Sequence, residues 1–275
     1  MRIVITGAGG QLGRALCLAL AHYDLLAFAH RQLDVSDREA TLALVECRPD
    51  VIIHAAAMTN VDGCELDPAA AYRVNALGTQ NVSLLAQRSG AVLCYVSTDY
   101  VYDGTKGSPY WEWDPTNPLS VYGASKLAGE WFVQALLDRF YIVRTAWVYG
   151  PDGTNFPRKV LDLAATRPQL GMVSTEAGHP TYAPHLAAAV ARLIQTQAFG
   201  LYHLVNEGCI SRFDFARAIL AGAGYHDYPL DPIQRFERPA TPPARVELHT
   251  LAARALGVRL PPWQDGLREW LASLK

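Results

Sequence analysis

A glycine-rich turn close to the start of the chain is the feature that most limits its possible folds. Arg2–Thr6 is a short run of mainly β-branched residues, typical of a buried strand, and Gly7-Ala8-Gly9-Gly10-Gln11-Leu12-Gly13 follows it directly. Gln11–His22 then carries leucines and alanines at helical spacing. A strand that leads through glycines straight into a helix is typical of the first unit of a parallel α/β sheet.

The same alternation of strands and helices continues through the first half of the chain. Further strands are predicted at Leu25–Ala29, Val51–His54, Ala91–Ser97 and Phe140–Arg144. Helices are predicted at Ser36–Cys47, with Ser36 as its cap, at Asp67–Arg88 and at Pro118–Leu137. Such βαβ units give a parallel sheet that helices cover on both faces, so the sequence predicts an α/β fold with a Rossmann-type doubly wound sheet.

The pattern changes after about residue 147, where the predicted elements become shorter. Helices are expected near 157–166, 184–197, 212–223 and 260–275, a strand at 201–205, and an irregular surface segment at 229–243, which holds five prolines. We therefore expect a first domain at 1–146 and a smaller C-terminal α+β lobe at 147–275, some segments of which interleave with the first domain. Ligands of such sheets bind beyond the carboxyl ends of the strands, so the site should lie between the two parts.

Charge and cysteine content exclude several classes of partner. Lys and Arg number 24 against 26 Asp and Glu, a formal net charge of −2, so no net positive field favours nucleic acid or an anionic membrane. The five cysteines form no Cys-x-x-Cys pair, which argues against a disulfide framework or a zinc site. Without a signal peptide or an apolar run of membrane length, the expected location is the cytoplasm.

The glycine turn has the form of a dinucleotide-binding loop. Gly7 allows the tight turn, Gly10 lets the backbone approach a pyrophosphate, and Gly13 lets the helix pack closely on the strand. The first N–H groups of the helix, at Gln11 and Leu12, would face the phosphates. The alternative is a tight turn between strand and helix that binds no ligand.

The residues after the next two strands indicate which dinucleotide is bound. NAD sites usually place a carboxylate after the second strand, whereas this chain has Arg31, whose guanidinium suits the 2′-phosphate of NADP. The prediction is therefore NADP, with NAD as the second choice, although Arg31 can also be an ordinary surface arginine. Asp34 and Val35 would flank the adenine. The small side chains of Ala55, Ala56 and Ala57 would let the cofactor lie across the end of the third strand.

Two groups of residues carry the predicted catalytic chemistry. Tyr122 and Lys126 stand four residues apart, on one helical face, and a nearby ammonium favours the ionised form of a phenol. We expect Tyr122 to be the proton donor, with a lowered pKa, and Lys126 to hold the nicotinamide ribose as well. Thr98, at the end of the fourth strand, would donate a hydrogen bond to a substrate carbonyl, and Asp99 would accept one from a sugar hydroxyl. The alternative for Tyr122 and Lys126 is an ordinary pair of side chains on the helix surface. The alternative for Thr98 is a residue that only caps or stabilises a turn.

These motifs, in this order, resemble the extended short-chain dehydrogenase/reductases and, within them, the dTDP-4-dehydrorhamnose reductases. The likeness runs from Gly7–Gly13 through VSTDYVYDG at 96–104, NPLSVYGASKLAGE at 117–130 and RTAWVYGPDGTNF at 144–156 to residues 260–263. It implies that 1–146 binds NAD(P) and 147–275 binds substrate. It also implies reduction of the 4-keto group of a nucleotide-linked deoxysugar, giving dTDP-L-rhamnose, with Tyr122, Lys126 and Thr98 catalytic and Trp147 joining Asp99 on the sugar.

The resemblance leaves other readings open. Related 4,6-dehydratases carry Thr-Asp-Glu where this chain has Thr98-Asp99-Tyr100, which favours plain reduction. An Arg-Pro-x-Asn-Ser-x-Leu-like segment is replaced by RPATPPARVEL at 238–248, so a different nucleotide-linked 4-keto sugar is an alternative substrate. Another alternative is a non-catalytic, NADP-binding regulatory subunit like the β subunit of methionine adenosyltransferase. No metal site is predicted, and a homodimer is the default expectation.

Overall fold

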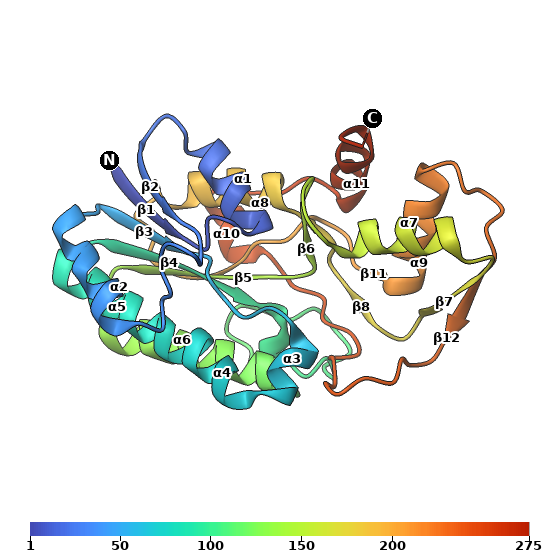
Figure 1. Cartoon of the computed structure of the whole chain (residues 1–275), viewed down its shortest axis with the longest axis horizontal. Coiled ribbons are helices and arrows are strands. Elements are labelled where there is room, and N and C mark those ends of the chain that lie inside the picture. Colours follow the sequence, from blue (N-terminus) through green and yellow to red (C-terminus); the bar gives the residue numbers. More distant parts are fainter. Residues whose placement is uncertain (275) are drawn as a thin grey trace.

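A six-stranded parallel sheet forms the centre of the protein. The computed structural model describes residues 1–274. The strands are β1 (Arg2–Thr6), β2 (Asp24–Phe28), β3 (Val51–His54), β4 (Val92–Thr98), β5 (Phe140–Thr145) and β10 (Gly200–His203). Their order is β10-β5-β4-β3-β1-β2, and every neighbouring pair is parallel (Figure 1). The predicted Rossmann-type α/β fold is confirmed.

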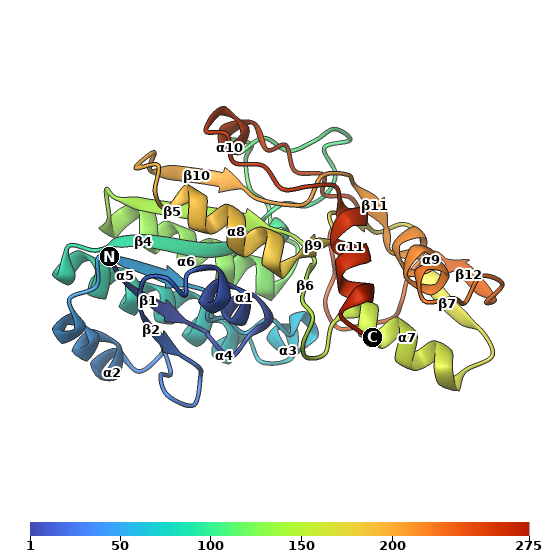
Figure 2. The ribbon, with the colours of Figure 1, turned by 90° about the horizontal axis from the view of Figure 1, so that it is seen from above.

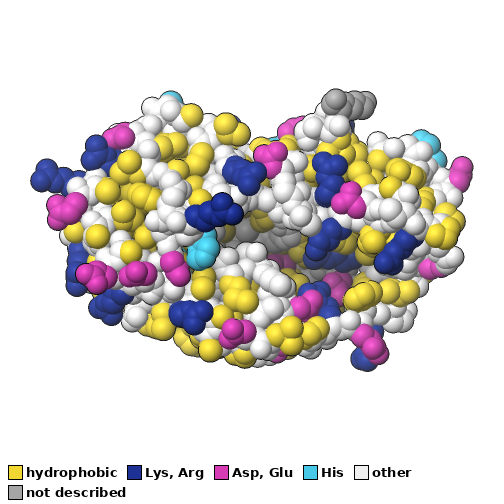
Figure 3. All heavy atoms as spheres, in the orientation of Figure 1, with side chains coloured by type: hydrophobic (Ala, Val, Ile, Leu, Met, Phe, Trp, Pro, Cys, Tyr) yellow, Lys and Arg dark blue, Asp and Glu magenta, His cyan; other side chains and the backbone are white. Residues whose placement is uncertain are grey.

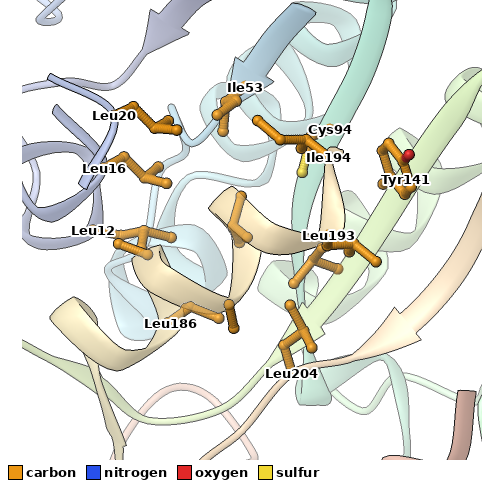
Figure 4. Close-up of a cluster of buried hydrophobic side chains, with 14 of the residues drawn as sticks. Leu12, Leu16, Leu20, Ile53, Cys94, Tyr141, Leu186, Leu193, Ile194 and Leu204 are labelled. Atoms are coloured by element: carbon orange, nitrogen blue, oxygen red, sulfur yellow. The ribbon is translucent and has the colours of Figure 1, made fainter. Parts of the chain in front are cut away.

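Helices cover both faces of this sheet because its strands are apolar on both sides. On one face lie α1 (Gln11–Ala19), α8 (Ala183–Leu193) and α10 (Leu251–Ala255), whose apolar side chains meet those of the strands. The other face carries α2 (Arg38–Ala43), α5 (Gly78–Ser89) and α6 (Val121–Leu136). Figure 4 shows Leu12 and Leu16 of α1 facing Leu186 of α8.

The second half of the chain supplies a smaller lobe at the carboxyl ends of the strands (Figure 2). Its helices are α7 (Phe156–Thr166), α9 (Arg212–Gly222) and α11 (Trp263–Ala272). Three two-stranded pairs join β6 (Val148–Tyr149) to β9 (Thr181–Tyr182), β8 (Ala177–Gly178) to β11 (Ile210–Ser211), and β7 (Leu170–Val173) to β12 (Leu230–Ile233). Its core combines aliphatic side chains with the large aromatic ones of Tyr149, Phe215, Trp263 and Trp270. Although they come from the second half, β10 and α8 belong to the sheet and its helical layer; the boundary at 147 stays a prediction.

Several element boundaries differ from the sequence prediction, for local reasons. Asp37, not Ser36, caps α2, because its carboxylate accepts from the N–H of Ala40 while the Ser36 hydroxyl bonds to Asp34. Strand β12 lies in the segment predicted to be irregular, because it finds a partner in β7. The long helix predicted before β4 consists of α4 (Pro68–Tyr72), a π-helical turn (Arg73–Leu77) and α5.

Three short helical elements complete the chain. They are α3 (Val61–Leu66) and two 3-10 turns, η1 (Leu44–Cys47) and η3 (Asp99–Val101). The last predicted helix ends at Ala272, and Lys275 lies outside the described residues. Within residues 1–274, no helix has both the length and the apolar character needed to cross a membrane.

The strand order determines where a ligand can enter. From β1 the chain runs outward to β2 and then returns to β3 on the other side of β1. Such a reversal opens a crevice outside the carboxyl ends of the two strands, because the loops that leave them diverge. The glycine turn after β1 and the alanines after β3 both stand at this crevice.

A buried ion pair holds α6 against the sheet. Glu130 of α6 is fully buried and Arg144 of β5 nearly so, and the guanidinium meets the carboxylate through Nε (2.9 Å) and Nη2 (2.6 Å). Ser97 donates to the same carboxylate from β4 at 2.5 Å. One carboxylate therefore joins α6, β4 and β5 directly behind Thr98.

We expect Arg144→Met to lower the free energy of unfolding by about 3–5 kcal/mol, because it leaves the Glu130 charge buried without its partner. Urea denaturation measures this loss, with the exposed Arg88→Met as the control. Combining Arg144→Met with Glu130→Gln should restore a part of the loss. A loss below about 1 kcal/mol for Arg144→Met would mean that the pair is not important for stability.

Candidate functional site

The glycine turn can be built only with glycine at two of its positions. Gly7 has a φ of +74°, and a Cβ there would stand 2.5 Å from the backbone nitrogen of Ala56. A Cβ at Gly13 would collide with the carbonyl oxygen of Gly7. The turn therefore brings β1, the loop after β3 and the start of α1 into direct contact.

The start of α1 is left free by this turn. Gly10 is the N-cap residue of α1 and has no side chain that could accept a hydrogen bond. The N–H groups of Gln11, Leu12 and Gly13 lie in the first turn, where the helix itself offers them no carbonyl acceptor. Within residues 1–274 these groups have no backbone partner, while Arg14 bonds to the Gly10 carbonyl. This arrangement suits a phosphate, because the helix dipole and the free donors act on the same point.

Residues after β2 and β3 form the neighbouring wall. Arg31 and Asp34 are exposed, and Val35 is buried. Asp34 accepts from the N–H of Ser36 at 2.9 Å and from its hydroxyl at 2.8 Å, and these bonds lower the pKa of the carboxyl. Ala55, Ala56 and Ala57 follow β3 and line the same space.

A close approach of α6 to the end of β4 brings Thr98 and Tyr122 to one place. Ser120 caps α6 by accepting from the N–H of Gly123. A Cβ at Gly123 would collide with the carbonyl oxygen of Tyr100, so glycine allows the helix to reach η3. Thr98 and Tyr122 line the same cavity, and the Tyr100 ring meets the Tyr122 ring edge-on with centroids 5.5 Å apart.

Lys126 is buried beneath this pair. Its Nζ donates to the carbonyl oxygen of Val96 at 2.7 Å and lies 4.1 Å from the centroid of the Tyr95 ring. Burial lowers the pKa of the ammonium to about 7, with Glu130 acting in the opposite direction. The side chain therefore changes its charge near neutral pH.

The prediction of a lowered phenol pKa is wrong for the protein without ligands. Burial raises the pKa of Tyr122 above its ordinary value, and the Thr98 hydroxyl offsets only a part of this rise. The ammonium of Lys126 is directed at the Val96 carbonyl and is itself only partly protonated near pH 7, so it does not overcome the desolvation. Tyr122 thus keeps its proton at neutral pH.

Asp99 is buried next to Thr98, with 2% of its surface exposed. It accepts a hydrogen bond from the Thr98 hydroxyl at 3.1 Å, while the same hydroxyl accepts from the N–H of Tyr100. Burial raises the pKa of Asp99 to about 7, although the hydrogen bond from Thr98 and the positive charge of Arg212 each act to lower it. Thr98 has the turn role named as its alternative, and it also faces Tyr122.

Trp147 stands in a strained backbone conformation on the opposite wall. Its φ is +45°, a value that non-glycine residues seldom adopt. A Cβ at Gly178 would stand 2.8 Å from the indole, and the guanidinium carbon of Arg212 lies 3.5 Å from a ring centroid. The indole is therefore held between a glycine and an arginine of the smaller lobe.

One cavity of about 790 Å³ joins these parts, and Figure 3 shows the surface hollowed between the two lobes. All predicted site residues line it, namely Gly7, Gly10, Gln11, Leu12, Gly13, Arg31, Asp34, Val35, Ala55, Ala56, Ala57, Thr98, Asp99, Tyr122, Lys126 and Trp147. Their roles stay predictions. Lining residues that the sequence reasoning missed include Ser97, Thr145, Thr154, Asn155 and Arg212.

The sequence alone indicates no role at the site for the missed residues. Four of them lie within the stretches that carry the family resemblance, namely Ser97, Thr145, Thr154 and Asn155. Asn155 caps α7, and Gln11 bridges to it: the Gln11 side-chain oxygen accepts from the N–H of Gly150 at 2.6 Å and from Asn155 at 3.3 Å. Arg212 is the first residue of α9 and reaches the cavity only because β11 pairs with β8. Contacts between residues so far apart in the chain appear only in the folded structure.

Comparison with known proteins identifies the family. The whole chain, residues 1–275, matches the family described as RmlD substrate binding domain. The chain belongs to this family. It is 40% identical over 284 residues to the dTDP-4-dehydrorhamnose reductase of Mycobacterium tuberculosis, covering 99% of this chain and 91% of the relative.

Two further relatives agree with this assignment. The chain is 37% identical over 274 residues to the spore coat polysaccharide biosynthesis protein SpsK of Bacillus subtilis, covering 98% of this chain and 96% of the relative. The crystal structure of dTDP-4-dehydrorhamnose reductase from Bacillus anthracis in complex with NADP superposes with a TM-score of 0.95 at 37% identity, and 98% of each chain is covered.

The raised pKa of Asp99 gives a prediction about stability. In the unfolded chain the carboxyl ionises near pH 4, but in the folded protein only near pH 7. The folded state thus binds the proton more tightly than the unfolded chain does. The stability that this proton contributes to the folded state is lost as the pH rises from about 4 through about 7. We expect Asp99→Asn to be more stable than the parent protein at pH 8, by a few kcal/mol, and to differ much less at pH 5.

Urea denaturation of both proteins at the two pH values measures this change. The exposed Asp138→Asn, which makes the same substitution on the surface, serves as the control. A constant difference between Asp99→Asn and the parent protein would show that the carboxyl titrates in the ordinary way.

Proposed function

We propose that this protein is an NADPH-dependent reductase that reduces the 4-keto group of dTDP-4-dehydrorhamnose to give dTDP-L-rhamnose. One observation carries the proposal: a single cavity runs from the free start of α1 to Thr98, Tyr122 and Lys126. The similarity to reductases of this name, over nearly the whole chain, supports the choice of substrate.

The residues present fit a nicotinamide dinucleotide. The free N–H groups of Gln11, Leu12 and Gly13 suit its diphosphate, and the contact between Gly7 and Ala56 leaves room for it above β1 and β3. Arg31, on the cavity wall, suits the 2′-phosphate of NADP, and a solved relative was crystallised with NADP. When bound, NADPH supplies the hydride.

The chain's own side chains supply the proton and orient the carbonyl. Thr98 and Tyr122 both line the cavity, so a carbonyl oxygen placed between them can accept a hydrogen bond from the Tyr122 phenol and, once the Thr98 hydroxyl turns away from Asp99, from that hydroxyl as well. Because its raised pKa keeps the proton on its Oη, Tyr122 can give that proton to the oxygen as negative charge develops there. Lys126, held by Val96, can supply positive charge below the phenol.

The residue after Asp99 favours reduction alone. Tyr100 is buried against Tyr122, and burial raises the pKa of its phenol to about 12. It therefore cannot replace the glutamate that serves as a base at this position in the 4,6-dehydratases. Asp99 and Trp147 are proposed to contact the sugar. A different nucleotide-linked 4-keto sugar remains the alternative substrate.

We also propose a cytoplasmic location and a homodimeric state. All five cysteines are free thiols, as expected in a reducing compartment. The homodimer rests only on the prevalence of twofold assemblies.

The test is NADPH oxidation with dTDP-4-dehydrorhamnose, followed by absorbance. We expect turnover by the parent protein and a loss of about 100-fold or more in kcat for Tyr122→Phe, with the Kd for NADPH changed less than about threefold. The exposed Tyr225→Phe is the matched control and should keep full activity.

The result also separates the two classes of function. Tight NADPH binding without turnover, on this sugar and on a panel of UDP- and GDP-linked 4-keto sugars, would contradict the reductase and support a regulatory subunit. Turnover that survives Tyr122→Phe would remove Tyr122 from the mechanism.

A further inference from the structure

Arg212 is the only lining arginine of the smaller lobe within residues 1–274, and its guanidinium forms no hydrogen bond with the described residues. Its side chain is 18% exposed. The nearest carboxylate, Glu176, stands 3.9 Å from Nε, which is too far for a hydrogen bond. A guanidinium carries five N–H donors, and burying them without acceptors is unfavourable, so the arrangement suits a ligand that brings strong acceptors.

The position of the guanidinium leaves its donors available. One face lies against the indole of Trp147 at 3.5 Å from a ring centroid, and the Phe156 ring stands 5.0 Å away. Stacking on aromatic rings holds the plane of an arginine but uses none of its N–H groups. The edge of the group can therefore serve a ligand in the cavity.

The charges around Arg212 come from both lobes. Glu176 and Asp99 face it with carboxylates, and Arg238, paired with Asp62 at 2.8 Å, faces it with a second positive charge. The Asp99 carboxyl holds its proton up to about pH 7, the value to which burial raises its pKa, which weakens its competition for the guanidinium. Glu176 forms a salt bridge with Arg212 at 3.9 Å but accepts no hydrogen bond from it.

We propose that Arg212 binds the diphosphate of the nucleotide-linked substrate. This inference rests on the proposed function, in which the keto group meets Thr98 and Tyr122 and the sugar meets Trp147. The diphosphate is attached to the sugar ring on the side away from the keto carbon, and Arg212 lines the same cavity in contact with the Trp147 ring. Its planar fork can bind two phosphate oxygens at once. The diphosphate of the cofactor is proposed to bind at the start of α1. The two diphosphates would therefore occupy separate sites.

The experiment is isothermal titration calorimetry with ligands that do not react. The parent protein, Arg212→Gln, Arg212→Lys and the control Arg217→Gln are each titrated with dTDP, thymidine and NADPH. Arg217 lies on the same helix but is 65% exposed. Thymidine lacks the diphosphate, so it reports any general damage to the pocket around Trp147.

We expect Arg212→Gln to weaken dTDP binding by about 10- to 100-fold, since it removes charge-assisted hydrogen bonds. Arg212→Lys should recover part of this loss. Thymidine and NADPH should bind each variant within about twofold of the parent protein, and Arg217→Gln should match the parent protein for all ligands.

Four outcomes would overturn the inference. They are no binding of dTDP by the parent protein, unchanged dTDP binding in Arg212→Gln, an equal loss for dTDP and thymidine, and a loss for NADPH without one for dTDP. Because no turnover is measured, a protein that fails to reduce the keto sugar but needs Arg212 for dTDP would contradict the proposed function and leave this inference intact.

Discussion

The contact between the ammonium of Lys126 and the carbonyl of Val96 ties α6 to β4 at the centre of the proposed site. The same helix carries Tyr122 one turn earlier and Glu130 one turn later, so this contact, the ion pair with Arg144 and the close approach at Gly123 act on one rigid element. Thr98 ends the strand on which α6 rests. The proposed proton donor, Tyr122, and the proposed carbonyl-orienting hydroxyl, that of Thr98, are thus placed by packing, and binding a substrate need not assemble them.

The two lobes meet around this centre through a few long-range contacts. Gln11 at the start of α1 holds the loop that begins at Gly150, and Trp147 leaves β5 in a strained conformation that Gly178 and Arg212 support. The cavity is therefore closed on the far side by residues of the smaller lobe. The glycine turn itself is local in sequence, whereas the far side of the cavity depends on contacts between distant segments.

The sheet and the cofactor side could be predicted from the sequence because their signals are local. Runs such as Val51–His54 and the spacing of Gly7, Gly10 and Gly13 have meaning within a single βαβ unit. Strand β12 and the role of Arg212 could not be predicted, since each depends on a pairing between segments far apart in the chain. The direction of the Tyr122 pKa was missed for a related reason: sequence spacing shows the nearby ammonium but not the desolvation, which is the larger effect.

The most direct test of the account follows the hydride itself. NADPH that carries deuterium at the transferable position of its nicotinamide is incubated with the protein and dTDP-4-dehydrorhamnose, and the product sugar is examined by mass spectrometry and proton NMR. The account predicts one deuterium per product molecule, bound to C4 of the sugar, where the carbonyl was. A product without deuterium, or with deuterium on another carbon, would contradict it.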